Sequence, residues 1–141
     1  MTSDHAAITI RNATSADIDT VAAFIAPFVE SRKLLPRTID ELEVLINTLF
    51  IAEYEGRIVG CAALEVYSSK LAELRSLAVS QDVQGMGVGK KLVQACIDLA
   101  RAQNVLEVMA ITSSEDFFKA CGFDFTLPGE KKALFFQTRD L

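Results

Sequence analysis

The segment from Gln84 to Gly89 reads Gln-Gly-Met-Gly-Val-Gly and holds three of the seven glycines of the chain. It follows an apolar run and precedes an amphipathic stretch, so it is predicted to join a strand to a helix. Glycine permits positive φ angles and lets backbone N–H groups come close to a ligand. A helix N-terminus adds unpaired N–H groups and a positive dipole end. The segment is therefore predicted to bind phosphate groups, with an ordinary glycine-rich turn as the alternative.

Two common nucleotide-binding motifs do not fit this segment. The dinucleotide fingerprint Gly-x-Gly-x-x-Gly would need a glycine where Lys90 or Leu92 stands. The ATP-binding P-loop would need a glycine at Gln84 and a hydroxyl residue at Lys91.

Hydrophobic periodicity predicts the elements that position this segment. A first helix can be capped by Ser15 or Asp17 and is expected to break or restart at Pro27. A second begins with the capping box Thr38-x-x-Glu41. Strands are expected at residues 8–10, 50–54, 58–67, 71–79, 105–111, 123–125 and 133–137, and further helices at 88–103 and 114–121. This order predicts an α+β (mixed α/β) fold with a mostly antiparallel sheet and one crossover around the glycines.

Length and composition narrow the class of protein. A chain of 141 residues suits one compact domain, residues 1–141, of which 1–6 are expected to be flexible. A net charge of −5 argues against a nucleic-acid partner or an anionic membrane surface, and neither a membrane span nor a secretory signal is apparent. The single histidine, His5, makes a metal site or a catalytic triad unexpected. Three scattered cysteines are typical of reduced core thiols in a cytoplasmic protein: Cys61, Cys96 and Cys121.

Three blocks, within about residues 8–126, resemble the GNAT superfamily of acetyltransferases. Glu73–Val79 resembles the strand that pairs with the pantetheine arm, Gln84–Gly89 the pyrophosphate loop, and Glu115–Phe123 the last helix with its Gly-Phe ending. The resemblance implies a GNAT-type domain with helices flanking the sheet and a splayed strand pair at the acetyl-CoA site. It also implies acetyl-CoA as co-substrate, with no metal.

The resemblance assigns coenzyme contacts to eleven residues: Leu77, Ala78, Val79, Gln84, Gly85, Met86, Gly87, Val88, Gly89, Lys90 and Phe118. For Lys90 a solvated helix face is the alternative role, and for Phe118 it is core packing. Many members of the family carry a tyrosine in the last helix that protonates the departing thiolate. Phe117 and Phe118 stand there in this chain, so that proton donor is unassigned; Ser114 or water is a candidate, although a helix cap also suits Ser114.

Glu73 stands where related histone-type acetyltransferases carry their catalytic base. The acceptor amine is protonated at neutral pH, and a carboxylate near the thioester can take that proton. Strand alternation places Glu73, Arg75, Leu77 and Val79 on one face. A surface ion pair between Glu73 and Arg75 is the alternative reading.

The segment around Arg37 and the one around Arg75 resemble the acetyltransferase domain of short bacterial N-acetylglutamate synthases. Arginine presents a planar fork that suits carboxylates, so Arg37 and Arg75 are candidates to hold an acidic acceptor. Capping or solvating a helix start is the alternative role for Arg37. The Cys-rich tail of many short synthases and the kinase-like domain of the long forms are not seen in this sequence.

The resemblance thus predicts a cytoplasmic N-acetyltransferase that acetylates the primary amine of a small molecule, with glutamate first and a place in arginine biosynthesis. The alternatives are a polyamine, an antibiotic or a protein amine as acceptor, or a non-catalytic acyl-CoA sensor. No nucleic-acid or membrane partner is expected, and a homodimer is an open possibility.

Overall fold

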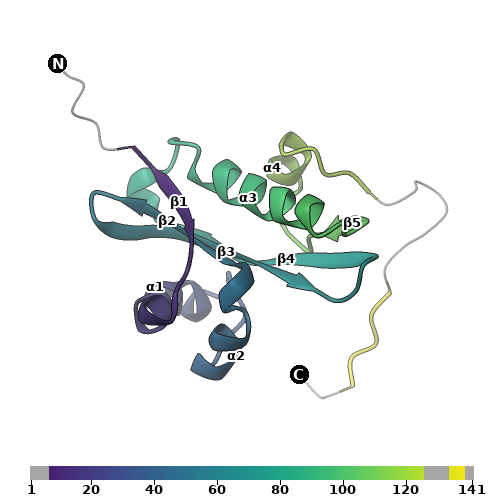
Figure 1. Ribbon diagram of the computed structural model, residues 1–141, viewed down its shortest axis with the longest axis horizontal. Coiled ribbons are helices and arrows are strands. Elements are labelled where there is room, and N and C mark those ends of the chain that lie inside the picture. The colour runs from purple at the N-terminus through teal and green to yellow at the C-terminus, as the bar shows by residue number, and fades with distance from the viewer. Residues whose placement is uncertain (1–6, 126–133, 139–141) are drawn as a thin grey trace. The chain divides into compact units, whose positions relative to one another are not determined.

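The structure, a computed structural model, describes residues 7–125 and 134–138. The chain divides into two compact units, residues 1–111 and 112–141. The first unit contains a five-stranded sheet with α1 (Ile18–Glu30), α2 (Ile39–Val44) and α3 (Val88–Ala102), and the second contains α4 (Glu115–Ala120) (Figure 1). No helix in the described ranges combines the length and apolar character needed to cross a membrane.

The sheet has the strand order β1-β2-β3-β4-β5. The first four strands pair antiparallel in chain order, and β5 pairs parallel to β4. A parallel neighbour requires a crossover, and α3 provides it. The predicted mostly antiparallel sheet with one crossover is therefore confirmed. The strands are β1 (Thr9–Asn12), β2 (Leu49–Tyr54), β3 (Arg57–Val66), β4 (Leu71–Val79) and β5 (Glu107–Met109).

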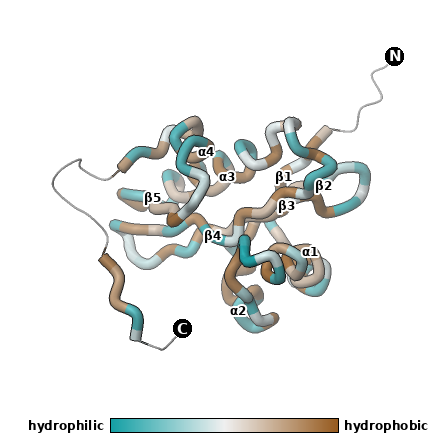
Figure 2. The backbone as a smooth tube through the Cα atoms, turned by 180° about the vertical axis from the view of Figure 1, so that it is seen from behind, coloured by the Kyte–Doolittle hydropathy of each residue, from teal (hydrophilic) through white to brown (hydrophobic). Residues whose placement is uncertain are grey.

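Helices cover both faces of the sheet. Figures 1 and 2 show α1 (Ile18–Glu30) and α2 (Ile39–Val44) on one face and α3 (Val88–Ala102) on the other. On the α1 and α2 face, Ile51 of β2 and Cys61 of β3 are fully buried in one apolar cluster with Val21 of α1. On the other face α3 lies so close that a Cβ on Gly60 would be 2.9 Å from a Leu92 methyl group. This apolar burial on both faces holds the strands that carry the site.

The helix starts follow the capping chemistry expected from the sequence, with one change. The Thr38 and Glu41 box is confirmed, since Thr38 Oγ1 accepts from the Glu41 N–H and Glu41 Oε1 accepts from the Thr38 N–H. The turn before α1 is capped by Thr14 together with Asp17, so Ser15 is not the capping residue.

Two further expectations are wrong. Pro27 does not break α1, which continues to Glu30. The rings of Phe24 and Phe28, on either side of the proline, lie 5.4 Å apart and pack against the core cluster, so packing outweighs the lost backbone hydrogen bond. Residues 123–125 and 134–137 form no strand and are mostly exposed, because apolar alternation needs a neighbouring strand to pair with. Residue 133 lies outside the described residues.

Candidate active site

A β-bulge divides β4 into two halves. Cys61 of β3 pairs with Ala78, but Ala63 pairs with Arg75, so two residues of β4 lie opposite one residue of β3. One of the two, Ser76, has a φ of 57°, in the left-handed region that non-glycine residues rarely adopt. A bulge of this kind bends the strand and redirects its side chains.

The bulge corrects the prediction that Glu73, Arg75, Leu77 and Val79 share one face. Glu73 and Arg75 do lie on one face, since they precede the bulge and alternate normally. Val79 follows the bulge and pairs with Gly60, whose face packs against α3. The first half of β4 therefore presents charged groups toward the α1 and α2 side, while Val79 belongs to the other face.

The splayed strand pair predicted at the coenzyme site is present between β4 and β5. The two strands pair only over Leu71–Glu73 and Glu107–Met109, and β4 continues to Val79 without a partner on that edge in the described part of the chain. Unpaired backbone groups on a strand edge can hydrogen-bond an extended amide chain. The edge therefore suits the pantetheine arm of coenzyme A.

The N-terminus of α3 has the features of an anion site. Its N-cap is Gly87, in the left-handed conformation, and no side chain caps the helix. Its first turn contains no acidic residue but does contain Lys90. The first N–H groups of a helix have no intrahelical acceptor, so here they remain available to phosphate oxygens. Both features fit a pyrophosphate.

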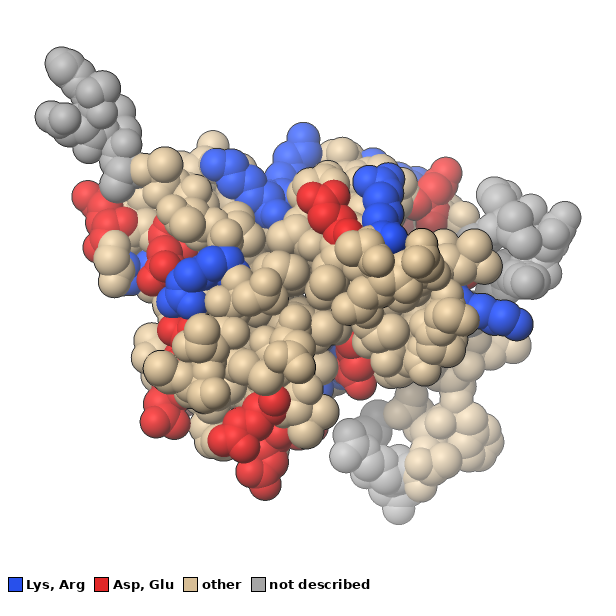
Figure 3. Space-filling view, in the orientation of Figure 1, with Lys and Arg blue, Asp and Glu red and all other residues tan. Residues whose placement is uncertain are grey.

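The start of α2 differs in each respect. It has a capping box, and Asp40 and Glu41 lie in its first turn. Acidic side chains gather over α1 and α2 in the space-filling view (Figure 3). The anion-binding features therefore distinguish α3 from α2 within the same unit.

Glu73 is held by a tyrosine, Tyr67, to which the sequence analysis assigned no role. The Tyr67 hydroxyl donates to Glu73 Oε1 at 2.6 Å, and the Glu73 side chain is 11% exposed. Burial, and then the hydrogen bond to Glu73, raise the pKa of Tyr67 above its usual value, which keeps the hydroxyl protonated as a donor. Tyr67 reaches Glu73 through the hairpin register, which is known only once β3 and β4 are paired: Glu65 pairs with Glu73, and strand alternation puts Tyr67 on the same face as Glu65.

Arg37 and Arg75 converge on one carboxylate, that of Glu65. Arg75 Nη1 donates to Glu65 Oε1 at 3.2 Å, and Arg37 Nη2 lies 3.5 Å from the same oxygen. The Arg37 side chain is 8% exposed, which excludes a solvated role, and its Nη2 makes no hydrogen bond with any described residue. Burial opposes the charge of Arg75, but the Glu73 and Glu65 carboxylates outweigh it and raise the pKa of Arg75.

The field of the two arginines extends to α2. The backbone N–H of Thr38 lowers the pKa of Glu41, and the charges of Arg37 and Arg75 lower it further. The structure thus brings Glu73, Arg75 and Arg37 together, as predicted, and adds Glu65 and Tyr67. The resemblance suggested Arg37 as an acceptor-binding residue, but its contact with Glu65 depends on the fold, because Arg37 precedes α2 and is distant in the chain from β3.

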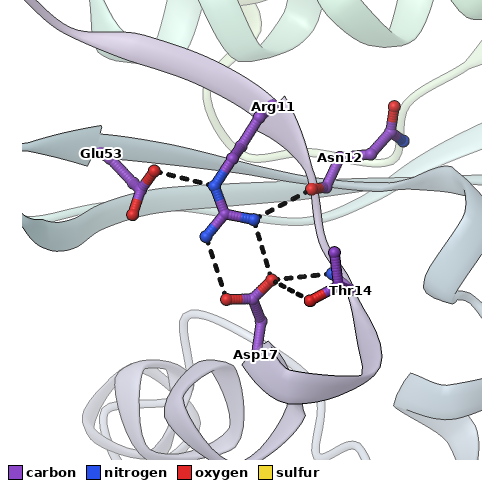
Figure 4. A network of polar contacts seen from close by, with 5 residues as sticks. All are labelled: Arg11, Asn12, Thr14, Asp17 and Glu53. Carbon is purple, nitrogen blue, oxygen red and sulfur yellow. Dashed lines mark hydrogen bonds and ion pairs between the residues drawn. The ribbon is translucent and has the colours of Figure 1, made fainter.

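Arg11 shows what a satisfied structural arginine looks like in this protein (Figure 4). Its guanidinium binds both oxygens of Asp17, at 2.9 and 3.0 Å, and its Nε donates to Glu53 at 2.8 Å. The paired hydrogen bonds from Arg11 hold the pKa of Asp17 well below its usual range. Arg37 and Arg75 have no comparable two-oxygen partner among the described residues.

The remaining predicted coenzyme residues differ in what they can offer. Ala78 and Val88 are buried in the core, so their backbone groups alone can contact a ligand. Met86 is 41% exposed, and Gln84 Nε2 donates to the Val79 carbonyl at 3.4 Å. Leu77 lies near the end of β4, and Gly85 and Gly89 lie in the glycine-rich segment at the start of α3.

In the second unit, Phe118 is buried between Phe117 and Phe123, with ring centroids 5.1 and 5.2 Å away. These contacts support core packing, the alternative considered for Phe118. Ser114 is at the N-cap of α4, but its side chain makes no capping hydrogen bond.

Buried thiols do not supply a nucleophile. Cys61 and Cys96 are both fully buried, and burial raises the pKa of each to about 12. A thiol with such a pKa is protonated, and therefore unreactive, at neutral pH. Within the described residues, no group of three or more His, Cys, Asp or Glu side chains is placed to hold a metal ion.

The unpaired edge of β4 and the uncapped N-terminus of α3 together fit a ligand with an amide-rich arm and a pyrophosphate, as coenzyme A has. Residues 17–123 match the acetyltransferase (GNAT) family. The chain belongs to this family and is an acetyl-CoA-dependent acetyltransferase.

Similar proteins include an N-acetyltransferase and an amino-acid acetyltransferase. The chain is 32% identical, over 81% of its length and 74% of the relative, to an uncharacterised N-acetyltransferase of Chlorobaculum tepidum. It is 37% identical to an amino-acid acetyltransferase of Neisseria meningitidis over 84% of its own length but 28% of that protein. The chain thus spans less than a third of this relative.

Solved structures show the same likeness. The N-acetylglutamate synthase of Neisseria gonorrhoeae, solved with coenzyme A and N-acetyl-glutamate, matches with a TM-score of 0.74 and 34% identity, over 84% of this chain and 28% of that one. A Mycobacterium tuberculosis protein solved in complex with CoA matches with a TM-score of 0.73 and 26% identity, over 81% and 70% of the two chains.

Proposed function

We propose that the acceptor is a small acidic amino acid, glutamate first, and that its α-amine receives the acetyl group. The observation that carries this proposal is the convergence of Arg37 and Arg75 on a single, poorly matched carboxylate oxygen. A guanidinium fork binds a carboxylate best through two parallel hydrogen bonds. The pair is therefore suited to bind a ligand carboxylate beside Glu73. The amino-acid acetyltransferases among the relatives support an acceptor of this class.

Acetyl-CoA supplies the thioester carbon that the acceptor amine attacks. The N–H groups at the start of α3 hold its pyrophosphate, and the free edge of β4 hydrogen-bonds its arm. Lys90 adds a positive charge at the same helix end.

Glu73 acts as the general base in this proposal. Its Oε1 is occupied by the Tyr67 hydroxyl, which leaves Oε2 to take a proton from the acceptor ammonium, directly or through a water. The neutral amine then attacks the thioester carbon. As the C–N bond forms and the C–S bond breaks, the nitrogen releases its second proton to solvent, and the coenzyme leaves as a thiolate that takes a proton from solvent to become the free thiol. Attack is direct, because neither Cys61 nor Cys96 offers an accessible thiolate for a covalent intermediate.

The experiment that tests the proposed acceptor measures thiol release with a panel of amino acids at a fixed concentration of acetyl-CoA. Glutamate should be acetylated far better than glutamine, norvaline or lysine, because these lack the second carboxylate. Arg37→Gln should raise the KM for glutamate at least tenfold without changing coenzyme affinity. Arg101→Gln is the matched control, since Arg101 is exposed in the last turn of α3, at the end of the helix opposite the proposed pyrophosphate site. A polyamine or basic peptide that outpaces glutamate would remove the acidic acceptor.

One wider assignment depends on this result, and three others are tested separately. The role in arginine biosynthesis requires glutamate as acceptor. A single domain over residues 1–141, a cytoplasmic location and a homodimer are proposals that sedimentation, limited proteolysis and fractionation can each test.

A further inference from the structure

One carboxylate oxygen serves two arginines in the acceptor cluster. Glu65 Oε1 lies 3.2 Å from Arg75 and 3.5 Å from Arg37. Charge-assisted hydrogen bonds of this kind are normally about 2.7–2.9 Å long. Both contacts are therefore longer than the arginines can make with a better-placed carboxylate, as the contacts of Arg11 at 2.8–3.0 Å show.

The charges that form ion pairs within the cluster already balance, and the Glu41 carboxylate of α2 adds negative charge nearby. Two arginines, Arg37 and Arg75, face two glutamates, Glu65 and Glu73. A ligand carboxylate that bound with all four in place would bring surplus negative charge into a partly buried site, which is unfavourable. One of the two glutamates must therefore give way when an acidic acceptor binds.

Burial and hydrogen bonding decide which glutamate moves. Glu73 is 11% exposed and is held by the Tyr67 hydroxyl at 2.6 Å. Glu65 is 30% exposed, and its contacts with the arginines are long. A partly exposed carboxylate with weak contacts loses little when it turns to solvent. The Arg37 side chain is only 8% exposed, so it stays buried in the site when Glu65 turns to solvent.

We propose that Glu65 is a specificity-determining residue that occupies the arginine pair until the carboxylate of the acceptor displaces it. This inference rests on the proposed function and extends it. Glu65 competes with the ligand, so it weakens acceptor binding and raises the KM. An amine without a carboxylate cannot displace Glu65, and its binding does not depend on that residue.

The test replaces Glu65 with glutamine, which keeps the shape and a carbonyl oxygen but removes the charge. Glu65→Gln should lower the KM for glutamate about fivefold to tenfold and leave the KM for acetyl-CoA unchanged. A fall of at least threefold supports the proposal. A smaller fall, no change or a rise overturns it, and a rise would mean that Glu65 instead binds the ammonium of the acceptor. Glu53→Gln, which removes a charge from the Arg11 network, is the control and should change neither constant.

A binding measurement makes the test independent of turnover. Calorimetry with glutarate, a dicarboxylate without an amine, is performed on wild type and Glu65→Gln, both with saturating coenzyme A and with folding checked by circular dichroism. Tighter binding to the variant supports displacement; equal binding, or none to either protein, overturns it. If wild type fails to acetylate glutamate, the proposed acceptor fails, while the glutarate result still decides whether Glu65 competes for the arginines.

Discussion

Tyr67 offers the sharpest test of how the base is held. Tyr67→Phe removes the hydroxyl that donates to Glu73 Oε1 at 2.6 Å and leaves the ring in place. A hydrogen bond to a charged group contributes about 1.5–3 kcal/mol. Because Tyr67 is 47% exposed, water replaces part of the lost hydrogen bond, and we expect the substitution to cost about 1.4 kcal/mol. That corresponds to a kcat about tenfold lower.

The assay is steady-state thiol release with glutamate as acceptor. The KM values for glutamate and acetyl-CoA should stay within about twofold, because Tyr67 acts on the base and not on either ligand. Tyr54→Phe is the matched control, since Tyr54 lies at the end of β2 in the turn toward β3. It should retain wild-type kcat.

A double-mutant cycle can refute this reasoning. Glu73→Gln should lower kcat about 10²-fold or more, with coenzyme affinity nearly intact and a smaller loss at high pH, where the amine is already neutral. If Tyr67 acts through Glu73, then adding Tyr67→Phe to Glu73→Gln should cost almost nothing more. Fully additive losses would show that Tyr67 has an independent role. Wild-type turnover in Glu73→Gln would remove Glu73 as the base.

The remaining predictions concern the coenzyme site and the core thiols. Gly87→Val should weaken acetyl-CoA binding at least about tenfold, as measured by calorimetry. Gly56→Val is the control: Gly56 has the same φ of 77° and equally open space, so the substitution imposes similar backbone strain but should leave coenzyme binding intact. Equal affinities of the two variants for acetyl-CoA would exclude this loop as the pyrophosphate site. Burial raises the pKa of Cys61 and Cys96 to about 12 from the ordinary value of 9.0. Between pH 9 and pH 12 the unfolded chain loses these thiol protons while the folded chain keeps them. The contribution of the two thiols to the free energy of unfolding is therefore complete below pH 9 and is lost as the pH rises toward 12. Urea unfolding of the Cys61→Ala, Cys96→Ala double variant should therefore show a weaker loss of stability above pH 9 than wild type shows, and parallel curves would contradict the assignment.

The sequence contained strong local signals for the elements around the coenzyme. The glycine spacing before an amphipathic stretch placed the start of α3 within a residue, and the capping box at Thr38 placed the start of α2. Such signals depend on neighbours along the chain, so they can be read without knowing the fold. The Pro27 expectation failed because contacts across the core, made by Phe24 and Phe28, outweighed a local rule.

The details of the acceptor site depend on pairing that the sequence does not encode locally. Strict alternation along β4 missed the bulge at Ser76, and with it the true face of Val79. Glu65 and Tyr67 join the site through the β3–β4 register, which becomes visible only once the hairpin is paired. Residues 123–125 were expected to be a strand from their apolar alternation, but such a segment becomes a strand only where a partner strand pairs with it.

The central claim is that two arginines beside a carboxylate base select an acidic amino acid as acceptor. The most direct measurement is the ratio of kcat/KM for glutamate to that for norvaline, in wild type and in Arg37→Gln. Wild type should prefer glutamate by at least about 10²-fold, and the variant should lose most of this preference while norvaline turnover stays the same. A wild-type ratio near one, or a ratio that Arg37→Gln leaves unchanged, would contradict the claim.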